Sequence, residues 1–357
     1  MRESILIWSF AALFFAGTVL ILKPYFQLVR DFGDTAAYIE ISRAIRSWDF
    51  SGIHVKHFWG LPYAAGAMSR LSGISCETSV VLVSAISSLC ALILSYRLWG
   101  GWVAVFNSLI SFDWFQRSFL GGSEPLFVAL LFGSFFAIRK QRWYLASLLA
   151  ALATITRPLG VFLLVGIAIT LLLRHQWQRL AGAVAIGLFV GLLYVLPMHL
   201  YLRDSLATVH SYGVLQTTSY PPLFGIPFKA IIVGTMLYPA PVSNLIITFG
   251  WIFFVLAGNV AMFASRSFRN YAAEHLPEAI FLALYLWSLY SYNAPALARG
   301  TFPRFAIPIV PFVLIALLRW LPKDRRLLWC LAVVSPVLAA FSAIGIRNVI
   351  SGVHRLL

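Results

Sequence analysis

The feature that most constrains this chain is its series of apolar segments, many of them close to the length that crosses a lipid bilayer. Hydrophobic residues make up 61% of the 357 residues and charged residues 11%, against roughly 25% charged residues in a typical soluble protein. A spanning helix needs roughly 20 apolar residues. The chain is therefore predicted to be an all-α polytopic membrane protein, with one integral membrane domain over 1–357.

Hydropathy and flanking charge predict about eleven spanning helices. The first of them follows Arg2, and Lys23-Pro24-Tyr25 comes after it in place of a small-residue cleavage site. We therefore expect an uncleaved membrane anchor rather than a signal peptide. The predicted spans are 5–22, 79–96, 100–118, 125–138, 143–156, 159–173, 180–201, 242–264, 277–292, 304–320 and 327–345.

The net charge of +15 is scattered over short loops and does not form the single basic patch that nucleic acid binding needs. Basic loops of membrane proteins lie in the cytoplasm, and anionic lipid headgroups are their expected partners. With the N-terminus inside, the outer segments are 23–78, 119–124, 202–241 and 293–303. These segments hold seven of the 12 acidic residues, namely Asp31, Asp34, Glu40, Asp49, Glu77, Glu124 and Asp204.

Both large outer loops are predicted to have a role beyond linking two spans. The first loop, 23–78, is predicted to contain two helices at the membrane surface. One is indicated by an amphipathic pattern over 36–48, and the other by an apolar stretch over 58–74 that contains Gly60, Pro62 and Gly66. The apolar face of the helix over 36–48 is expected to carry Ala37, Ile41, Ala44, Ile45 and Trp48. The second loop, 202–241, is rich in Tyr and Pro, and its length favours a binding or lid function.

Asp34 is the first candidate catalytic residue. It lies in Asp-Phe-Gly-Asp-Thr-Ala-Ala-Tyr (31–38), just after the first span, where a carboxylate can remove a proton from an incoming hydroxyl. The alternative is an N-cap of the helix that follows, and the two roles are compatible. Asp31 is the second choice as base, with a solvated loop acid as its alternative, and Tyr38 is a candidate substrate contact.

Glu124 and three arginines complete the main set of candidates. Glu124, the second candidate catalytic residue, precedes Pro125 at the start of a predicted helix, where favourable helix-terminus electrostatics is the alternative explanation. Arg157 lies between two apolar spans, where a cation needs an acid or a phosphate as partner. Arg299 and Arg304 flank the last outer loop and are predicted to hold an anionic headgroup. The alternative for all three arginines is snorkelling to the interface, which we favour for Arg299.

The remaining candidates are aromatic, imidazole and ammonium side chains of the outer loops. Lys56 and His57 are predicted to contact substrate or headgroup, as are His210 and Tyr212 in the second loop. His54 and His57 have no third ligand nearby, and Cys76, Cys90 and Cys330 have neither metal-site nor disulfide spacing. The sequence therefore indicates no metal site and no certain cofactor, and a divalent metal stays open.

An outer carboxylate with nearby arginines suits transfer of a sugar from a polyprenyl phosphate. The phosphate leaves without a proton donor, and arginines offset its developing charge. One carboxylate then suffices to deprotonate the acceptor hydroxyl, whereas glycoside hydrolysis needs two. A single displacement predicts inversion at the anomeric carbon.

The sequence resembles GT-C membrane glycosyltransferases at several motifs. Asp-Phe-Gly-Asp-Thr-Ala-Ala-Tyr (31–38) is similar to their first-loop acid motif, and Gly-Gly-Ser-Glu-Pro-Leu-Phe (121–127) is similar to the Ser-Glu-x-Leu-Phe region of the second GPI mannosyltransferase. Ala-Leu-Ala-Thr-Ile-Thr-Arg-Pro-Leu-Gly (151–160) is similar to bacterial members, and Pro-Arg-Phe-Ala-Ile-Pro-Ile-Val-Pro (303–311) resembles a late arginine-aromatic-proline helix of the family.

The resemblance implies a polyprenyl-phosphate donor of a hexose such as mannose, a catalytic acid in the first outer loop and surface helices there. The acceptor is expected to be a hydroxyl of a glycan, lipid or protein, at the periplasmic face of a bacterial inner membrane. Two alternatives stay open. A transporter or flippase for a lipid-linked sugar would use the same arginines, and a non-catalytic membrane subunit would not need Asp34.

Overall fold

The computed structural model describes residues 2–31, 34–50, 53, 57–109, 111–208, 210–211, 224–237, 242–317 and 325–356. Over these residues the chain is helical, with no strand beyond one isolated bridge between Phe224 and Tyr292. The predicted all-α class is therefore confirmed. The chain divides into two compact units, one formed by 1–160, 184–208 and 323–357, the other by 161–183 and 209–322.

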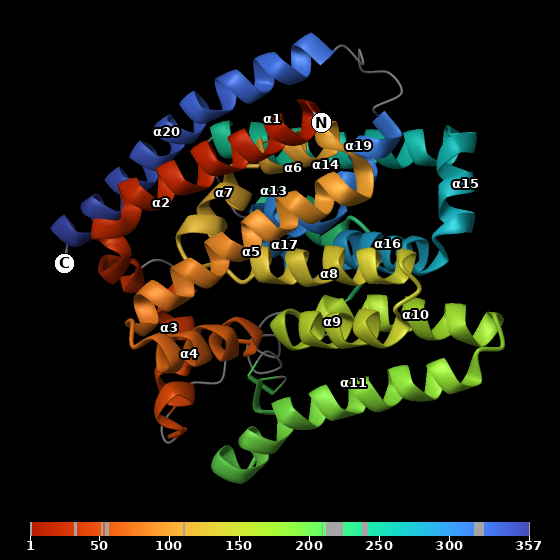
Figure 1. The fold of residues 1–357 in the computed structure, drawn as a ribbon, viewed down its shortest axis with the longest axis horizontal. Coiled ribbons are helices and arrows are strands. Elements are labelled where there is room, and N and C mark those ends of the chain that lie inside the picture. Colours follow the sequence, from red (N-terminus) through yellow and green to blue (C-terminus); the bar gives the residue numbers. More distant parts are fainter. Residues whose placement is uncertain are drawn as a thin grey trace. The chain divides into compact units, whose positions relative to one another are not determined.

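The first unit holds most of the helices of the N-terminal half and the C-terminal helix (Figure 1). Its helices are α1 (Arg2–Ala11), α2 (Gly17–Leu22), α3 (Thr35–Ser47), α4 (Gly60–Ser72), α5 (Cys76–Trp99), α6 (Gly101–Leu109), α7 (Phe112–Phe119), α8 (Glu124–Arg139), α9 (Trp143–Thr156), most of α11 (Trp177–Pro197) and α20 (Arg325–Leu356).

The second unit contains two close helix crossings. A Cβ on Gly166 would lie 2.6 Å from the carbonyl oxygen of Pro277, and one on Gly258 would lie 2.5 Å from Val313 Cγ1. Small residues thus allow both crossings. The helices are α10 (Val161–Leu173), α13 (Lys229–Leu237), α14 (Val242–Ala264), α15 (Arg266–Glu274), α16 (Leu276–Ser291), α17 (Pro295–Gly300), α18 (Phe302–Ala306) and α19 (Val310–Leu317).

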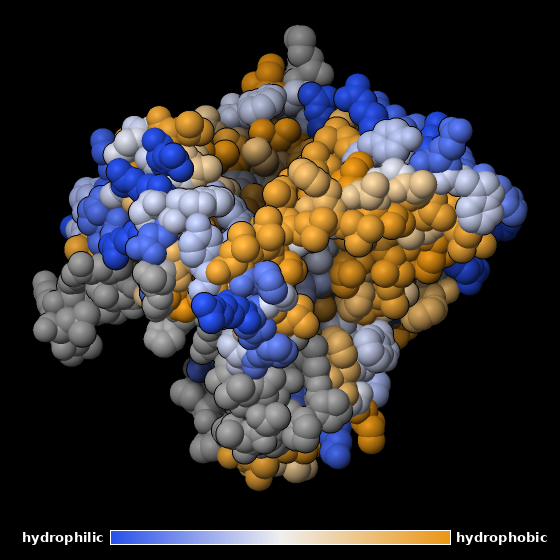
Figure 2. Space-filling view, turned by 90° about the horizontal axis from the view of Figure 1, so that it is seen from below, coloured by the Kyte–Doolittle hydropathy of each residue, from blue (hydrophilic) through white to orange (hydrophobic). Residues whose placement is uncertain are grey.

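Several helices have the length and composition of membrane spans. Four stretches within the described residues qualify, and a fifth would be the pair 113–119 and 124–139, bent by 100°. The four are Ile7–Val29, Cys76–Trp99, Trp177–Leu202 and Asn244–Ala264. Large apolar side chains such as Phe253 and Phe263 are exposed, and hydrophobic residues cover broad areas of the face in Figure 2. Soluble proteins rarely expose so much apolar surface, so lipid contact explains it.

The predicted span 100–118 is wrong as a single helix. Gly100, with a φ of 89°, ends α5, and α6 ends at Leu109. Ser111 then starts α7 as its N-cap, because its hydroxyl accepts a hydrogen bond from the Trp114 N–H at 3.1 Å. Two short helices therefore replace the predicted span, and the second one leads into α8 through the segment 119–124, which we call the elbow.

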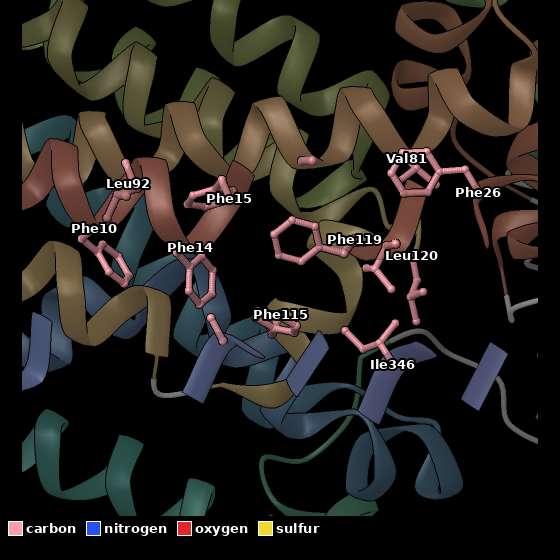
Figure 3. Packing of buried hydrophobic residues seen from close by; sticks show 14 of the residues in the cluster. Phe10, Phe14, Phe15, Phe26, Val81, Leu92, Phe115, Phe119, Leu120 and Ile346 are labelled. Atoms are coloured by element: carbon pink, nitrogen blue, oxygen red, sulfur yellow. The ribbon is translucent and has the colours of Figure 1, made fainter. Parts of the chain in front are cut away.

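Apolar packing of the first span fixes α7. Phe14 meets Phe115 edge-on with ring centroids 5.2 Å apart, and Phe15 meets Phe119 at 5.7 Å. Phe115 and Phe119 are one helical turn apart and form the buried side of α7 (Figure 3). Arg117 lies between them in sequence, so its side chain leaves the helix on another side.

The helices α5 and α8 lie side by side and run in the same direction. Ser84 of α5 donates a hydrogen bond to the Gly122 carbonyl at the start of α8, and Arg139 at its end donates to the Leu98 carbonyl. At 1.5 Å per residue, Ser84 lies about 12 Å along α5 from Cys76. The elbow is therefore level with the interior of α5 and not with its first turn.

Helices are present at both stretches predicted to be helical between the first and second spans. The stretch predicted over 36–48 is α3, and the stretch predicted over 58–74 is α4. Trp48 ends α3 in the left-handed region, and its side chain is exposed. The close approach of the two helices needs Gly66, since a Cβ there would lie 2.9 Å from Ile45 Cγ2.

Candidate active site

The carboxylate of Asp34 lies at the start of α3 and faces a guanidinium. Asp34 has the N-cap position, but its side chain makes no capping hydrogen bond. Its Oδ2 lies 3.9 Å from Arg117 Nη1, and its side chain is 35% exposed. This distance exceeds that of a hydrogen bond, so the contact is electrostatic. The side-chain capping expected for Asp34 is not observed, and its role as a base stays a prediction.

Two hydrogen bonds hold the first turns of α3 against the elbow. Thr35 Oγ1 donates to the Leu120 carbonyl at 2.6 Å, and Tyr38 Oη donates to Ser123 Oγ at 3.0 Å. Gly121 has a φ of +82° and a Cβ there would lie 2.9 Å from Thr35 Cγ2, so a side chain would be strained at this position. Asp34 is therefore fixed at its backbone on a rigid support.

Tyr38 acts as a neutral hydrogen-bond donor. Burial raises the pKa of its hydroxyl to about 12, and the negative charges of Glu124 and Asp34 contribute in the same direction. At neutral pH a phenolate is therefore not available as a base. The ring of His57 meets the Tyr38 ring edge-on with centroids 5.2 Å apart, so His57 borders the same place.

Glu124 and Arg157 form a buried ion pair. Arg157 Nη1 lies 2.5 Å from Glu124 Oε1, with the side chains 17% and 3% exposed, and 3.5 Å from Ser123 Oγ. Pro158 explains the approach, because a residue before proline is kept out of the helical region. Arg157 accordingly ends α9 in an extended conformation. The predicted acid partner of Arg157 is thus Glu124.

Arg117 is a site residue that the sequence did not predict. It lies inside the predicted span 100–118, where the averaged hydropathy does not distinguish a single cation. The signal that could have found it is local, since Ser111 is a helix cap and Phe115 and Phe119 form a one-turn apolar stripe with Arg117 between them. That pattern indicates a short amphipathic helix with Arg117 on its polar side.

These residues form one group, which we call the elbow cluster: Asp34, Tyr38, Arg117, Ser123, Glu124 and Arg157. It combines two carboxylates with two guanidinium groups, joined through two hydroxyls. One carboxylate is enclosed and the other is partly open to solvent. Chemically, the cluster offers a proton acceptor beside a donor-rich cation.

The structure brings four of the predicted site residues into the elbow cluster, His57 borders it at Tyr38, and the other six lie elsewhere or stay predictions. Asp31 ends a 3₁₀ helix, Lys23–Asp31. Arg299 in α17, Arg304 in α18 and the exposed His210 belong to the second unit, so their expected approach to Asp34 remains a prediction. Lys56 and Tyr212 lie outside the described residues. Among the residues that are described, no group of three His, Cys, Asp or Glu could hold a metal ion.

No family model matches this chain, and no curated protein matches it. Among solved structures it is similar to the crystal structure of ArnT from Cupriavidus metallidurans bound to undecaprenyl phosphate. The identity is 17% and the TM-score 0.48, over 97% of this chain and 72% of that chain. What the elbow cluster can do is therefore inferred from its own residues.

Proposed function

We propose that this protein is a membrane glycosyltransferase of the GT-C type. It transfers a hexose such as mannose from a polyprenyl-phosphate donor to an acceptor hydroxyl, with Asp34 as general base. The observation that supports this most is the partly exposed Asp34 carboxylate, held 3.9 Å from Arg117 beside a second, enclosed ion pair. Because the exposed apolar surface suits a protein embedded in lipid, a lipid-linked substrate is the one we propose for that carboxylate.

The proposed reaction is a single displacement. The acceptor oxygen forms a bond to the anomeric carbon while the bond from that carbon to the phosphate oxygen breaks. The electron pair goes to the phosphate, and the hydroxyl proton goes to the Asp34 carboxylate. A phosphodiester of charge −1 and a carboxylate become a phosphate monoester of charge −2 and a carboxylic acid, so the charges balance. The configuration at the anomeric carbon is inverted.

The enclosed pair has a supporting role in this proposal. Because Glu124 is buried and bonded to Arg157, we assign it to holding that guanidinium in place rather than to proton transfer. Arg157 offsets the charge that develops on the phosphate. The hydrogen bond between Tyr38 and Ser123 holds α3 against the elbow, so that Asp34 and Arg157 keep their positions relative to each other.

The remaining predicted residues are proposed as substrate contacts. Asp31, Lys56 and His57 belong to the first outer loop with Asp34. His210, Tyr212, Arg299 and Arg304 keep the role predicted from the sequence and are proposed to hold the donor or the acceptor. The proposed location is the periplasmic face of a bacterial inner membrane.

The test is sugar transfer by the purified protein in proteoliposomes. Radiolabelled hexoses on a polyprenyl phosphate are supplied with a lipid extract as acceptor, and the anomeric configuration of the product is determined. We expect a labelled product of inverted configuration. Movement of the labelled donor across the bilayer without any transfer would instead support the flippase alternative, and retention of configuration would contradict the single displacement.

A further inference from the structure

Arg117 differs from Arg157 in how its guanidinium is used. Arg157 has a close carboxylate partner and a nearby hydroxyl. Arg117 has its Nη1 at 3.9 Å from Asp34, and its buried Nε has no hydrogen-bond partner among the described residues. A guanidinium carries five N–H donors, and buried donors are nearly always satisfied. An oxyanion ligand would satisfy those of Arg117.

The carbon stem of Arg117 is fixed, so the guanidinium has a defined location. A Cβ on Gly122 would lie 2.5 Å from Arg117 Cβ and 2.7 Å from its Cδ, which shows how closely the stem follows the glycine backbone. The Gly122 N–H also donates to the Arg117 carbonyl at 2.8 Å. Only the end of the side chain can reorient, and Asp34 lies within its reach.

We infer that Arg117 binds the phosphate of the lipid donor and turns away from Asp34 to do so. This inference rests on the proposed function and adds a residue and an order of events to it. A planar guanidinium binds phosphate through two parallel hydrogen bonds, which a carboxylate 3.9 Å away does not receive in the free protein.

The exchange of partners would couple donor binding to the activity of the base. A nearby cation favours the charged form of a carboxylate, so a carboxylate that loses this neighbour holds a proton more readily. Asp34 would become a stronger base only after Arg117 has moved to the phosphate. The donor would therefore bind before the acceptor hydroxyl is deprotonated, and unproductive deprotonation would be avoided.

The first test is lipid binding in nanodiscs, with undecaprenyl phosphate and neutral undecaprenol as probes. Arg117→Gln should weaken binding of the phosphate lipid by about 10- to 100-fold, the loss expected for hydrogen bonds to a charged group, and leave undecaprenol unchanged. The affinity of Arg117→Lys for undecaprenyl phosphate should lie between those of the wild type and Arg117→Gln. Arg46→Gln is the matched control, because Arg46 is an exposed arginine of α3 bonded to Ser69.

The outcomes separate this inference from the proposed function. If the wild type prefers undecaprenyl phosphate and Arg117→Gln keeps that preference, the role of Arg117 is wrong and the proposed function stands. If the wild type binds both lipids equally, the proposed function itself fails. Displacement of the lipid by inorganic phosphate at equal concentration would mean that the site takes free phosphate, which would overturn the lipid assignment.

The second test is structural and needs no variant. The protein is compared by electron cryomicroscopy with and without undecaprenyl phosphate. The inference predicts that Arg117 lies within about 3 Å of a phosphate oxygen, at hydrogen-bond distance, and farther from Asp34 than in the free protein. A guanidinium that still faces Asp34 in the lipid complex would overturn it.

Discussion

The two ion pairs of the elbow cluster join the same kinds of groups, yet they differ in distance and in burial. Glu124 and Arg157 are 2.5 Å apart with a glutamate side chain 3% exposed, whereas Asp34 and Arg117 are 3.9 Å apart with an aspartate 35% exposed. A close, buried pair fixes its members. A long, partly open pair leaves both of its members able to take another partner. The proposed function therefore uses the close pair as support and the open pair for the reaction.

The largest expected effect concerns the stability of the enclosed pair. Glu124→Ala leaves Arg157 buried without its carboxylate, and breaking a buried pair costs about 3–5 kcal/mol. We expect a large drop in the thermal unfolding temperature in detergent. Glu40→Ala, which removes an exposed glutamate on α3, serves as control and should change the temperature little.

Replacing both members of that pair sharpens the comparison. Glu124→Leu combined with Arg157→Met removes both charges, and such apolar replacements are often neutral in stability. The double variant should therefore unfold close to the wild-type temperature and still lack sugar transfer, because Arg157 is proposed to offset charge on the phosphate. Recovery of both stability and transfer would show that the enclosed pair has no part in the reaction.

A smaller effect is expected at the elbow glycine that lies against Arg117. Gly122→Ala would place a Cβ 2.5 Å from Arg117 Cβ, and overpacking of this kind costs about 1–3 kcal/mol. The same Cβ would lie 2.8 Å from Glu124 Oε2, so both pairs should be disturbed, and transfer and stability should both fall. Gly187→Ala in α11 is the control, since nothing lies within 4 Å of that glycine. Equal losses in both variants would contradict this.

The smallest effect concerns Tyr38, which lies between the two pairs. Tyr38→Phe removes the hydrogen bond to Ser123, worth about 1 kcal/mol. The folded-state pKa of about 12 lies above the ordinary value of 10, so the folded protein keeps a proton that the unfolded chain loses. The resulting stabilisation is complete below pH 10 and disappears as the pH rises toward 12. Thermal unfolding at pH 9 and pH 11 should show a steeper decline for the wild type than for Tyr38→Phe.

Much of the fold follows from local sequence signals. Apolar runs predict the helices, because apolar side chains must be covered by a bilayer or by a core. The amphipathic pattern of 36–48 predicts α3. The break at Ser111 was missed, since hydropathy averaged over 100–118 does not register a single capping hydroxyl. The left-handed end of α3 at Trp48 is likewise not specified by the apolar pattern.

Most members of the candidate site were predictable from the sequence, whereas Arg117 and the pairing of the charges were not. Asp34, Glu124 and Arg157 each stand out as charges at helix ends next to apolar segments. Which acid meets which base depends on how α3, the elbow and the end of α9 pack together. Arg117 joins Asp34 across more than 80 residues of chain, and no local pattern specifies such a contact.

The central claim is that Asp34, and not Glu124, accepts the proton. The most direct measurement is the single-turnover rate of sugar transfer by Asp34→Asn, with donor bound in excess and Glu40→Gln as the matched loss of a carboxylate on α3. We predict a rate about 10²- to 10⁴-fold below wild type for Asp34→Asn, with donor binding and unfolding temperature retained and Glu40→Gln unchanged. A folded Asp34→Asn protein that transfers sugar at the wild-type rate would contradict the claim.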